Sequence, residues 1–172
     1  GYLFPNDDFK SLALQLSANL NDQQTTIGLT NFRGRQLSGY ANLIFQQELG
    51  KNPEENYYKL GASFQVDSVS EILSLRYLNL TNNNTNLNNT RLEIVPGIYG
   101  EFTHKSEKWG VIGGLRGDYT SYFDQYFITP RLHIRHSFSN ETAIKLMGGS
   151  GRRTPFMIME NVGYMASSRK WI

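Results

Sequence analysis

Apolar and polar side chains alternate one by one along most of this chain. The clearest example is Phe9–Leu20, where even positions carry Leu12, Leu14, Leu16, Ala18 and Leu20. The odd positions between them hold Ser, Ala, Gln and Asn. A period of two residues is typical of a β-strand with one apolar and one polar face. The chain is therefore predicted to be all-β.

Seven segments show this period. They are Phe9–Leu20, Leu37–Glu48, Tyr57–Asp67, Arg91–Thr103, Trp109–Tyr119, Tyr126–Phe138 and Glu141–Gly151. Strands of soluble proteins usually have about 5–6 residues, whereas a strand that crosses a membrane needs about 9–11. The lengths favour an antiparallel up-and-down transmembrane β-barrel, of which this chain would supply about seven long strands.

The connections between these segments alternate in length. Three are short, namely Gly50–Asn56, His104–Lys108 and Ser139–Asn140. The others are longer or richer, namely Asn21–Gln36, Ser68–Thr90 and Thr120–Gln125. Alternation of this kind places all the tight turns at one end of the sheet, as in outer-membrane barrels with their short periplasmic turns and longer outer loops.

Aromatic residues gather near the ends of the segments. They include Tyr57, Tyr58, Phe102, Trp109, Tyr119, Tyr122, Phe123, Tyr126, Phe127 and Phe138. Rings with one apolar and one wet side suit the two interfaces of a membrane. Packing inside a β-sandwich is the alternative, but these rings bracket the strands instead of filling their middles.

Composition and motifs give no reason to expect catalysis. Seventeen basic and fifteen acidic residues leave a net charge of +2, which is too balanced to indicate a nucleic-acid partner. With no cysteine, a disulfide scaffold and thiolate metal sites are excluded. His104, His133 and His136 do not form a metal-ligand pattern, and no nucleophile elbow or carboxylate pair is evident. We expect no enzyme activity, no cofactor and no metal.

Strand parity predicts two opposite faces on the last strands. Arg116, Asp118, Arg131, His133 and Arg135 are expected to face a polar lumen, with Val111, Leu115, Leu132 and Ile134 facing lipid. The assignment of the faces depends on energy, because an arginine on the lipid side near the midplane costs about 2–4 kcal/mol.

A glycine-rich, doubly basic stretch, "GGSGRRTPFMIMENVG", spans Gly148–Gly163. It lacks the Gly-Lys-Ser/Thr of a nucleotide P-loop, and no helical pattern follows it. A phosphate cradle needs that helix N-terminus. The stretch is therefore interpreted as the end of a strand and its exit into a loop.

The run Phe127–Gly163 resembles the barrel of TonB-dependent outer-membrane receptors. In that family a strand starting Thr-Pro-Arg is followed by a tight turn and by a strand ending in Gly-x-Gly-x-Arg-x-Pro and an acid. The matching residues here are Thr129, Pro130 and Arg131, then Gly149, Gly151, Arg153, Pro155 and Glu160. Val95–Tyr122 is similar to the preceding hairpin, and the resemblance covers the chain from about Phe9 to its end.

The resemblance implies a transport function in the cell outer membrane. Such receptors are barrels of about 22 strands closed by a plug. They import iron chelates, cobalamin or glycans, and a TonB-type protein that engages the plug supplies energy from the inner membrane. We recognise no plug and no energy-coupling box in this sequence. Residues 1–172 are therefore expected to be a partial outer-membrane β-barrel domain, the middle strands of a larger barrel, whose substrate is unknown.

A second hypothesis is a stand-alone small β-barrel that binds a ligand in its interior, either lipocalin-like or a small outer-membrane protein. A lipocalin-like barrel would turn its apolar face inward. Alternation does not say which face is inside, so both hypotheses remain open on sequence alone.

Overall fold

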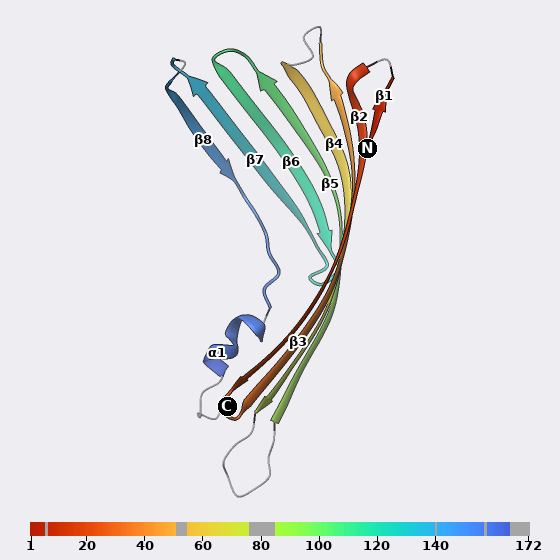
Figure 1. Ribbon diagram of the computed structural model, residues 1–172, viewed down its shortest axis with the longest axis vertical. Helices are drawn as coiled ribbons and strands as arrows, with labels where there is room; N and C mark the ends of the chain where they lie inside the picture. The colour runs from red at the N-terminus through yellow and green to blue at the C-terminus, as the bar shows by residue number, and fades with distance from the viewer. Residues whose placement is uncertain (6, 51–54, 76–84, 140, 157, 166–172) are drawn as a thin grey trace, which may run out of the picture. The chain divides into compact units, whose positions relative to one another are not determined.

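The computed structural model describes residues 1–5, 7–50, 55–75, 85–139, 141–156 and 158–165. Eight strands form one antiparallel sheet in chain order, β1 to β8, which is an up-and-down meander (Figure 1). Their bounds are β1 (Tyr2–Phe4), β2 (Asp7–Ile27), β3 (Thr30–Glu48), β4 (Asn56–Leu75), β5 (Thr85–Lys105), β6 (Trp109–Thr120), β7 (Gln125–Ser137) and β8 (Ala143–Gly149). The predicted all-β class and sequential antiparallel pairing are confirmed, and the sheet is not closed into a barrel.

Two short helical turns follow the last strand. They are the 3-10 turn η1 (Met159–Asn161) and the helix α1 (Val162–Met165). Within the described part of the chain, no helix has the length and apolar character needed to cross a membrane.

The chain divides into two compact units. The first unit contains Gly1–Ser17, Tyr40–Gln65 and Ile94–Arg152, and the second contains Ala18–Gly39, Val66–Glu93 and Arg153–Ile172. Strands β2 to β5 therefore contribute residues to both units, whereas β6, β7 and β8 belong to the first unit alone.

The longest strands extend well beyond their apolar alternation. The prediction that Asn21–Gln36 is a loop is wrong, because β2 continues to Ile27 and β3 starts at Thr30. A two-residue turn joins them, and Gly28 has a φ of 59°, which suits glycine at the first position of a tight hairpin turn. The hairpin is mostly polar, and Phe32 near its turn is buried in an apolar core.

The predicted loop Ser68–Thr90 is also partly wrong. Strand β4 runs on to Leu75 and β5 begins at Thr85, and the residues between them, 76–84, lie outside the described part. The last strand is shorter than predicted, and β1 was not predicted at all. By contrast, β6 and β7 lie within one residue of their predicted bounds.

Register separates two faces in the first unit. Leu115 pairs with Pro130 and Val111 pairs with Ile134, so the apolar side chains of β6 and β7 share one side, the apolar face. Arg116 pairs with Thr129 on the opposite side, the polar face. Because neighbouring residues of a strand point to opposite sides, Asp118, Arg131, His133 and Arg135 also lie on the polar face. Whether that face lines a lumen remains a prediction.

Pairing stops beside two prolines. The pairing of β5 with β6 reaches Gly97, the residue after Pro96. The pairing of β7 with β8 ends at Arg131 and Gly149, next to Pro130. A proline has no amide hydrogen to donate, so these positions suit the ends of the two pairings.

The second unit contains a small apolar core. Phe32 and Leu73 are fully buried, Leu75 and Ile158 nearly so, and Met159 packs against them. The segment after β8 thus contributes Ile158 to a core whose other side chains come from β3 and β4. Val69 is the one further buried apolar side chain among the described residues.

Candidate functional site

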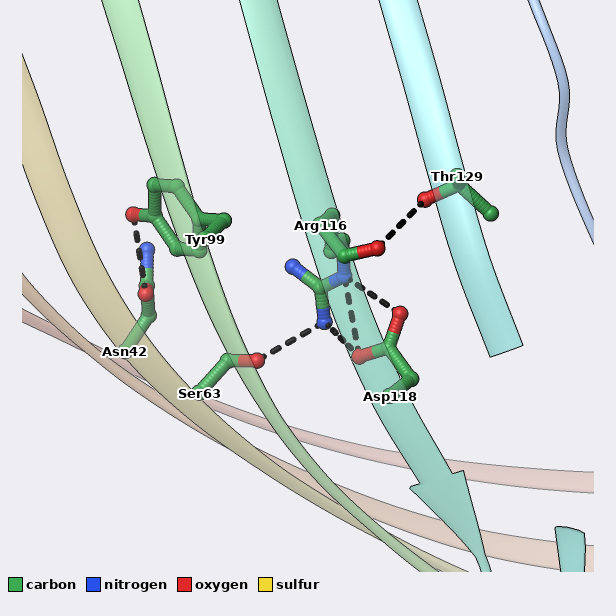
Figure 2. A network of polar contacts seen from close by, with 6 residues as sticks. All are labelled: Asn42, Ser63, Tyr99, Arg116, Asp118 and Thr129. Carbon is green, nitrogen blue, oxygen red and sulfur yellow. Dashed lines mark hydrogen bonds and ion pairs between the residues drawn. The ribbon is translucent and has the colours of Figure 1, made fainter. Parts of the chain in front are cut away.

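A hydrogen-bonded network extends across the polar face of the first unit (Figure 2). At its centre, the Arg116 guanidinium donates to both carboxylate oxygens of Asp118, with Nε–Oδ2 and Nη2–Oδ1 both 2.7 Å. Nη2 also donates to Ser63 Oγ on β4 at 2.7 Å. Fork-shaped pairing of this kind is the strong form of an ion pair. Asp118 is only 15% exposed, so the network lies partly outside bulk water.

Tyr99 connects this ion pair to the earlier strands. The Arg116 guanidinium lies 5.7 Å from the centre of the Tyr99 ring, within the range of a cation–π contact. The Tyr99 hydroxyl donates to Asn42 Oδ1 at 3.1 Å, and Asn42 Nδ2 donates to Gln15 Oε1 at 3.1 Å. Polar contacts therefore link β2 to β6 without interruption.

A second ion-pair group lies on the same face. Glu101 on β5 pairs with Arg131 on β7 at 2.8 Å and with Lys59 on β4 at 3.8 Å. Arg131 crosses over Gly114 to reach it, and a Cβ at Gly114 would lie 2.8 Å from Arg131 Nε. Glycine on the intervening strand thus makes room for the arginine.

Some of the predicted lumen residues contact each other in the structure, and others do not. Arg116 and Asp118 contact each other, and Arg131 finds Glu101 instead. His133 pairs in register with Ile112, and Arg135 with Gly110. Neither residue forms an ion pair with another residue of the described part of the chain.

The residues of the family motif are divided between the units, with Arg153, Pro155 and Glu160 in the second and the others in the first. Arg153 Nη2 and Glu160 Oε2 are 3.0 Å apart, and Glu160 Oε1 accepts the amide hydrogen of Phe156 at 3.2 Å. Both contacts join Glu160 in η1 to residues of the segment that connects β8 to η1. Gly149 ends β8 in the first unit, where a Cβ would lie 3.0 Å from the Pro130 carbonyl oxygen, and Gly151 has open space around it.

Two buried carboxylates hold this segment, and neither was predicted as a site residue. Glu71, which is 1% exposed, accepts the Met159 amide at 2.8 Å and the Asn89 side-chain amide at 2.7 Å. Glu93 accepts the hydroxyl of Thr154 at 2.9 Å. A nearby arginine, Arg91, donates to the Pro155 carbonyl at 3.0 Å. The strand period had placed Arg91 and Glu93 on one face, whereas Glu71 fell in a predicted loop.

The groups of the network bind one another through hydrogen bonds and ion pairs. In the part of the chain that the structure describes, no three His, Asp or Glu residues lie close enough to hold a metal ion. Comparisons with protein-family models, curated proteins and solved structures found no match to this chain.

Proposed function

We propose that this chain is part of the wall of an outer-membrane active-transport receptor. Such a receptor imports a scarce nutrient, an iron chelate, cobalamin or a glycan, with energy from the inner membrane. The observation that carries the proposal is the opposite chemistry of the two faces in the first unit. One face exposes apolar side chains, and the other carries the hydrogen-bonded polar network.

The apolar face is unusual for a protein surrounded by water. Its exposed side chains include Leu14, Leu16, Leu43, Leu60, Phe64, Ile98, Leu115, Ile128, Leu132 and Leu146. Soluble monomers rarely expose continuous apolar patches of more than a few hundred Å². Five apolar side chains are buried among the described residues, against thirty large ones that are exposed. Lipid around this face would remove these apolar side chains from water, which the packing of the chain itself does not do.

The spacing of aromatic residues fits a bilayer. Trp109 stacks on His136 with ring centres 4.1 Å apart, and Tyr119 contacts Tyr126 at 5.0 Å. Trp109 and Tyr119 lie ten residues apart on the same face of β6. That interval is about 34 Å along a strand, or about 25 Å across a membrane at a tilt of about 40°. The apolar band of an outer-membrane barrel has about this height.

The open edges of the sheet support a larger assembly. β1 and β8 each have one partner strand in this structure. In a membrane every backbone group needs a partner, so a sheet in lipid has to close into a barrel. Further strands of the full-length protein would pair with these edges, and its plug would engage the TonB-type energy-transducing protein.

An arginine scan of the two faces tests the membrane assignment. Leu132 lies on the apolar face, and Met147, which pairs with His133, lies on the polar face at a similar depth. Leu132→Arg in the full-length protein is expected to cost about 2–4 kcal/mol of folding free energy, with little effect from Met147→Arg. The readout is heat-modifiable gel mobility after folding into bilayers. Loss for Met147→Arg but not for Leu132→Arg would reverse the faces and favour a ligand-binding barrel with an apolar interior.

A growth experiment tests transport. A strain lacking the gene is grown with an iron chelate, cobalamin or a glycan as the limiting nutrient. The proposal expects a defect on at least one nutrient, restored by the wild-type gene only when the energy-transducing protein is present. Restoration that does not need this protein would rule out energised transport.

A further inference from the structure

Three aromatic rings and an arginine meet near the turn that joins β6 to β7. Tyr122 and Phe123 lie in the turn, Phe127 lies on β7, and Arg152 follows β8. The Arg152 guanidinium lies over the Phe127 ring, 3.8 Å from its centre, and 5.0 Å from the centre of the Phe123 ring. The Tyr122 and Phe123 rings pack edge to face at 4.8 Å. We call these four residues, which all belong to the first unit, the aromatic platform.

The ring of Phe127 lies on the polar face of the sheet. Phe127 pairs in register with Asp118, and residues directly opposite each other on paired strands point to the same side. The guanidinium that covers this ring lies on that side as well. Tyr119 and Tyr126 form the next pair along the two strands, and they lie on the apolar face because neighbouring residues of a strand point to opposite sides. The aromatic platform is therefore distinct from the rings proposed to lie at the membrane interface.

Hydrogen bonds hold the turn between β6 and β7 in one shape. The Ser121 amide donates to the Ile94 carbonyl on β5 at 3.0 Å, and the Ile94 amide donates to Ser121 Oγ at 2.8 Å. Asp124 has a φ of 51°, a left-handed conformation that Asp adopts more readily than most residues. Its carboxylate accepts the Tyr119 hydroxyl at 2.7 Å. A turn fixed in this way loses little conformational entropy when a ligand packs on the rings that it presents.

Exposed ring surface lies beside hydrogen-bonding groups of both kinds. Tyr122 and Phe123 remain 42% and 45% exposed. A guanidinium stacked on a ring keeps its N–H groups in its own plane for hydrogen bonds, so Arg152 supplies donors. Asp118 supplies acceptors from the position opposite Phe127, at a strand spacing of about 4.8 Å. An anionic chelate would be repelled by this carboxylate, whereas hydroxyl groups donate to a carboxylate and accept from a guanidinium.

We propose that the aromatic platform binds a sugar ring of a neutral glycan. The C–H groups on one face of a sugar ring form an apolar surface that packs on the exposed Phe123 and Tyr122 rings. Hydroxyl groups at the rim of the sugar bond to Arg152 and to Asp118. The inference rests on the proposed transport function, because it selects the glycan from the three classes of nutrient that such a receptor imports.

The test measures binding of neutral oligosaccharides to the full-length protein in detergent. An array of α- and β-linked glucans, xylans, mannans and galactans identifies the glycan that binds best, and calorimetry then gives its affinity. We expect Phe123→Ala and Arg152→Gln to weaken this binding by about tenfold or more. Both side chains are exposed, so the two variants should fold like wild type. Phe138→Ala makes the same change at an exposed ring in the turn after β7 and should leave the affinity unchanged.

A ferric tris-catecholate and cyanocobalamin serve as probes for the other two classes of nutrient. Binding of either probe without binding of any glycan overturns the proposal. So does the absence of binding to every glycan of the array, or glycan binding that both variants leave unchanged.

The same variants separate the site from the transport function. Glycan binding that depends on Phe123 and Arg152, without energised growth on that glycan, supports the site and excludes the transport function. Energised growth on a glycan whose binding both variants leave unchanged supports the transport function and excludes the site.

Discussion

The ring of Tyr99 on β5 lies directly over Gly61 on the neighbouring strand β4. A Cβ added at Gly61 would lie much closer to Cζ and to the hydroxyl oxygen than van der Waals contact allows. From this position the Tyr99 hydroxyl reaches over β4 and donates to Asn42 on β3. A glycine that weakens a strand on its own thus allows a hydrogen bond between strands that are not adjacent.

Gly61→Ala should therefore destabilise the protein even though alanine is the better strand residue. The new methyl group displaces the Tyr99 ring and breaks its bond to Asn42, at an expected cost of about 1–3 kcal/mol. Urea unfolding of the protein measures the change. Gly113→Ala is the matched control, because a Cβ there meets no atom within 4 Å. Equal stabilities of the two variants would mean that Tyr99 does not depend on Gly61.

Asp118→Ala should destabilise the polar face more than Ser63→Ala. Asp118 accepts three charge-assisted hydrogen bonds from Arg116, and Ser63 accepts one. Removing Asp118 leaves a partly buried guanidinium without its counter-charge, and we expect a loss of about 1–3 kcal/mol in unfolding free energy. In an Arg116→Gln background the same Asp118→Ala change should cost much less. Equal costs in both backgrounds would show that the pair is not coupled.

Glu71→Ala should loosen the segment that follows β8 and contains Met159. The Met159 amide and the Asn89 side chain both lose their acceptor. Leaving buried donors unsatisfied costs about 1–3 kcal/mol, so amide exchange at Met159 should become about 10- to 100-fold faster. Glu141→Ala, at the exposed turn between β7 and β8, is the control. Unchanged exchange at Met159 in Glu71→Ala would exclude this carboxylate as the anchor.

The sequence predicts the strands best where one face has to be apolar. In β6 and β7, residues such as Leu115 and Leu132 alternate with Arg116 and Arg131, so both strand limits and faces can be read directly. The end of β2 is polar on both faces, as in the stretch from Gln23 to Thr26, and at the start of β3 Phe32 stands alone among polar residues. Hydrophobic periodicity carries no information there, and only the turn at Gly28 could have suggested a hairpin.

For the candidate site, the sequence predicts the face on which each residue lies but not its partners. Parity placed Arg116, Asp118 and Arg131 on one face, because a side chain's face is a local property of its strand. Their partners depend on register between strands, which periodicity does not fix. Contacts such as that from Glu71 to Met159, 88 residues along the chain, depend on the path of an irregular segment and could not be read from the sequence pattern.

The motif pair Arg153 and Glu160 leads to the last prediction. Their side chains are 73% and 33% exposed, so the ion pair itself should contribute only about 0.2–1 kcal/mol. Glu160 also accepts the Phe156 amide, and this second bond orders the backbone before η1. Glu160→Ala should therefore reduce the unfolding free energy, and speed amide exchange at Phe156, more than Arg153→Ala does. The coupling of the two changes in a double-mutant cycle should stay below about 1 kcal/mol. If the protein is a nutrient transporter as proposed, loss of nutrient-dependent growth in Arg153→Ala with folding intact would assign the arginine to the transported ligand and not to the fold of this segment.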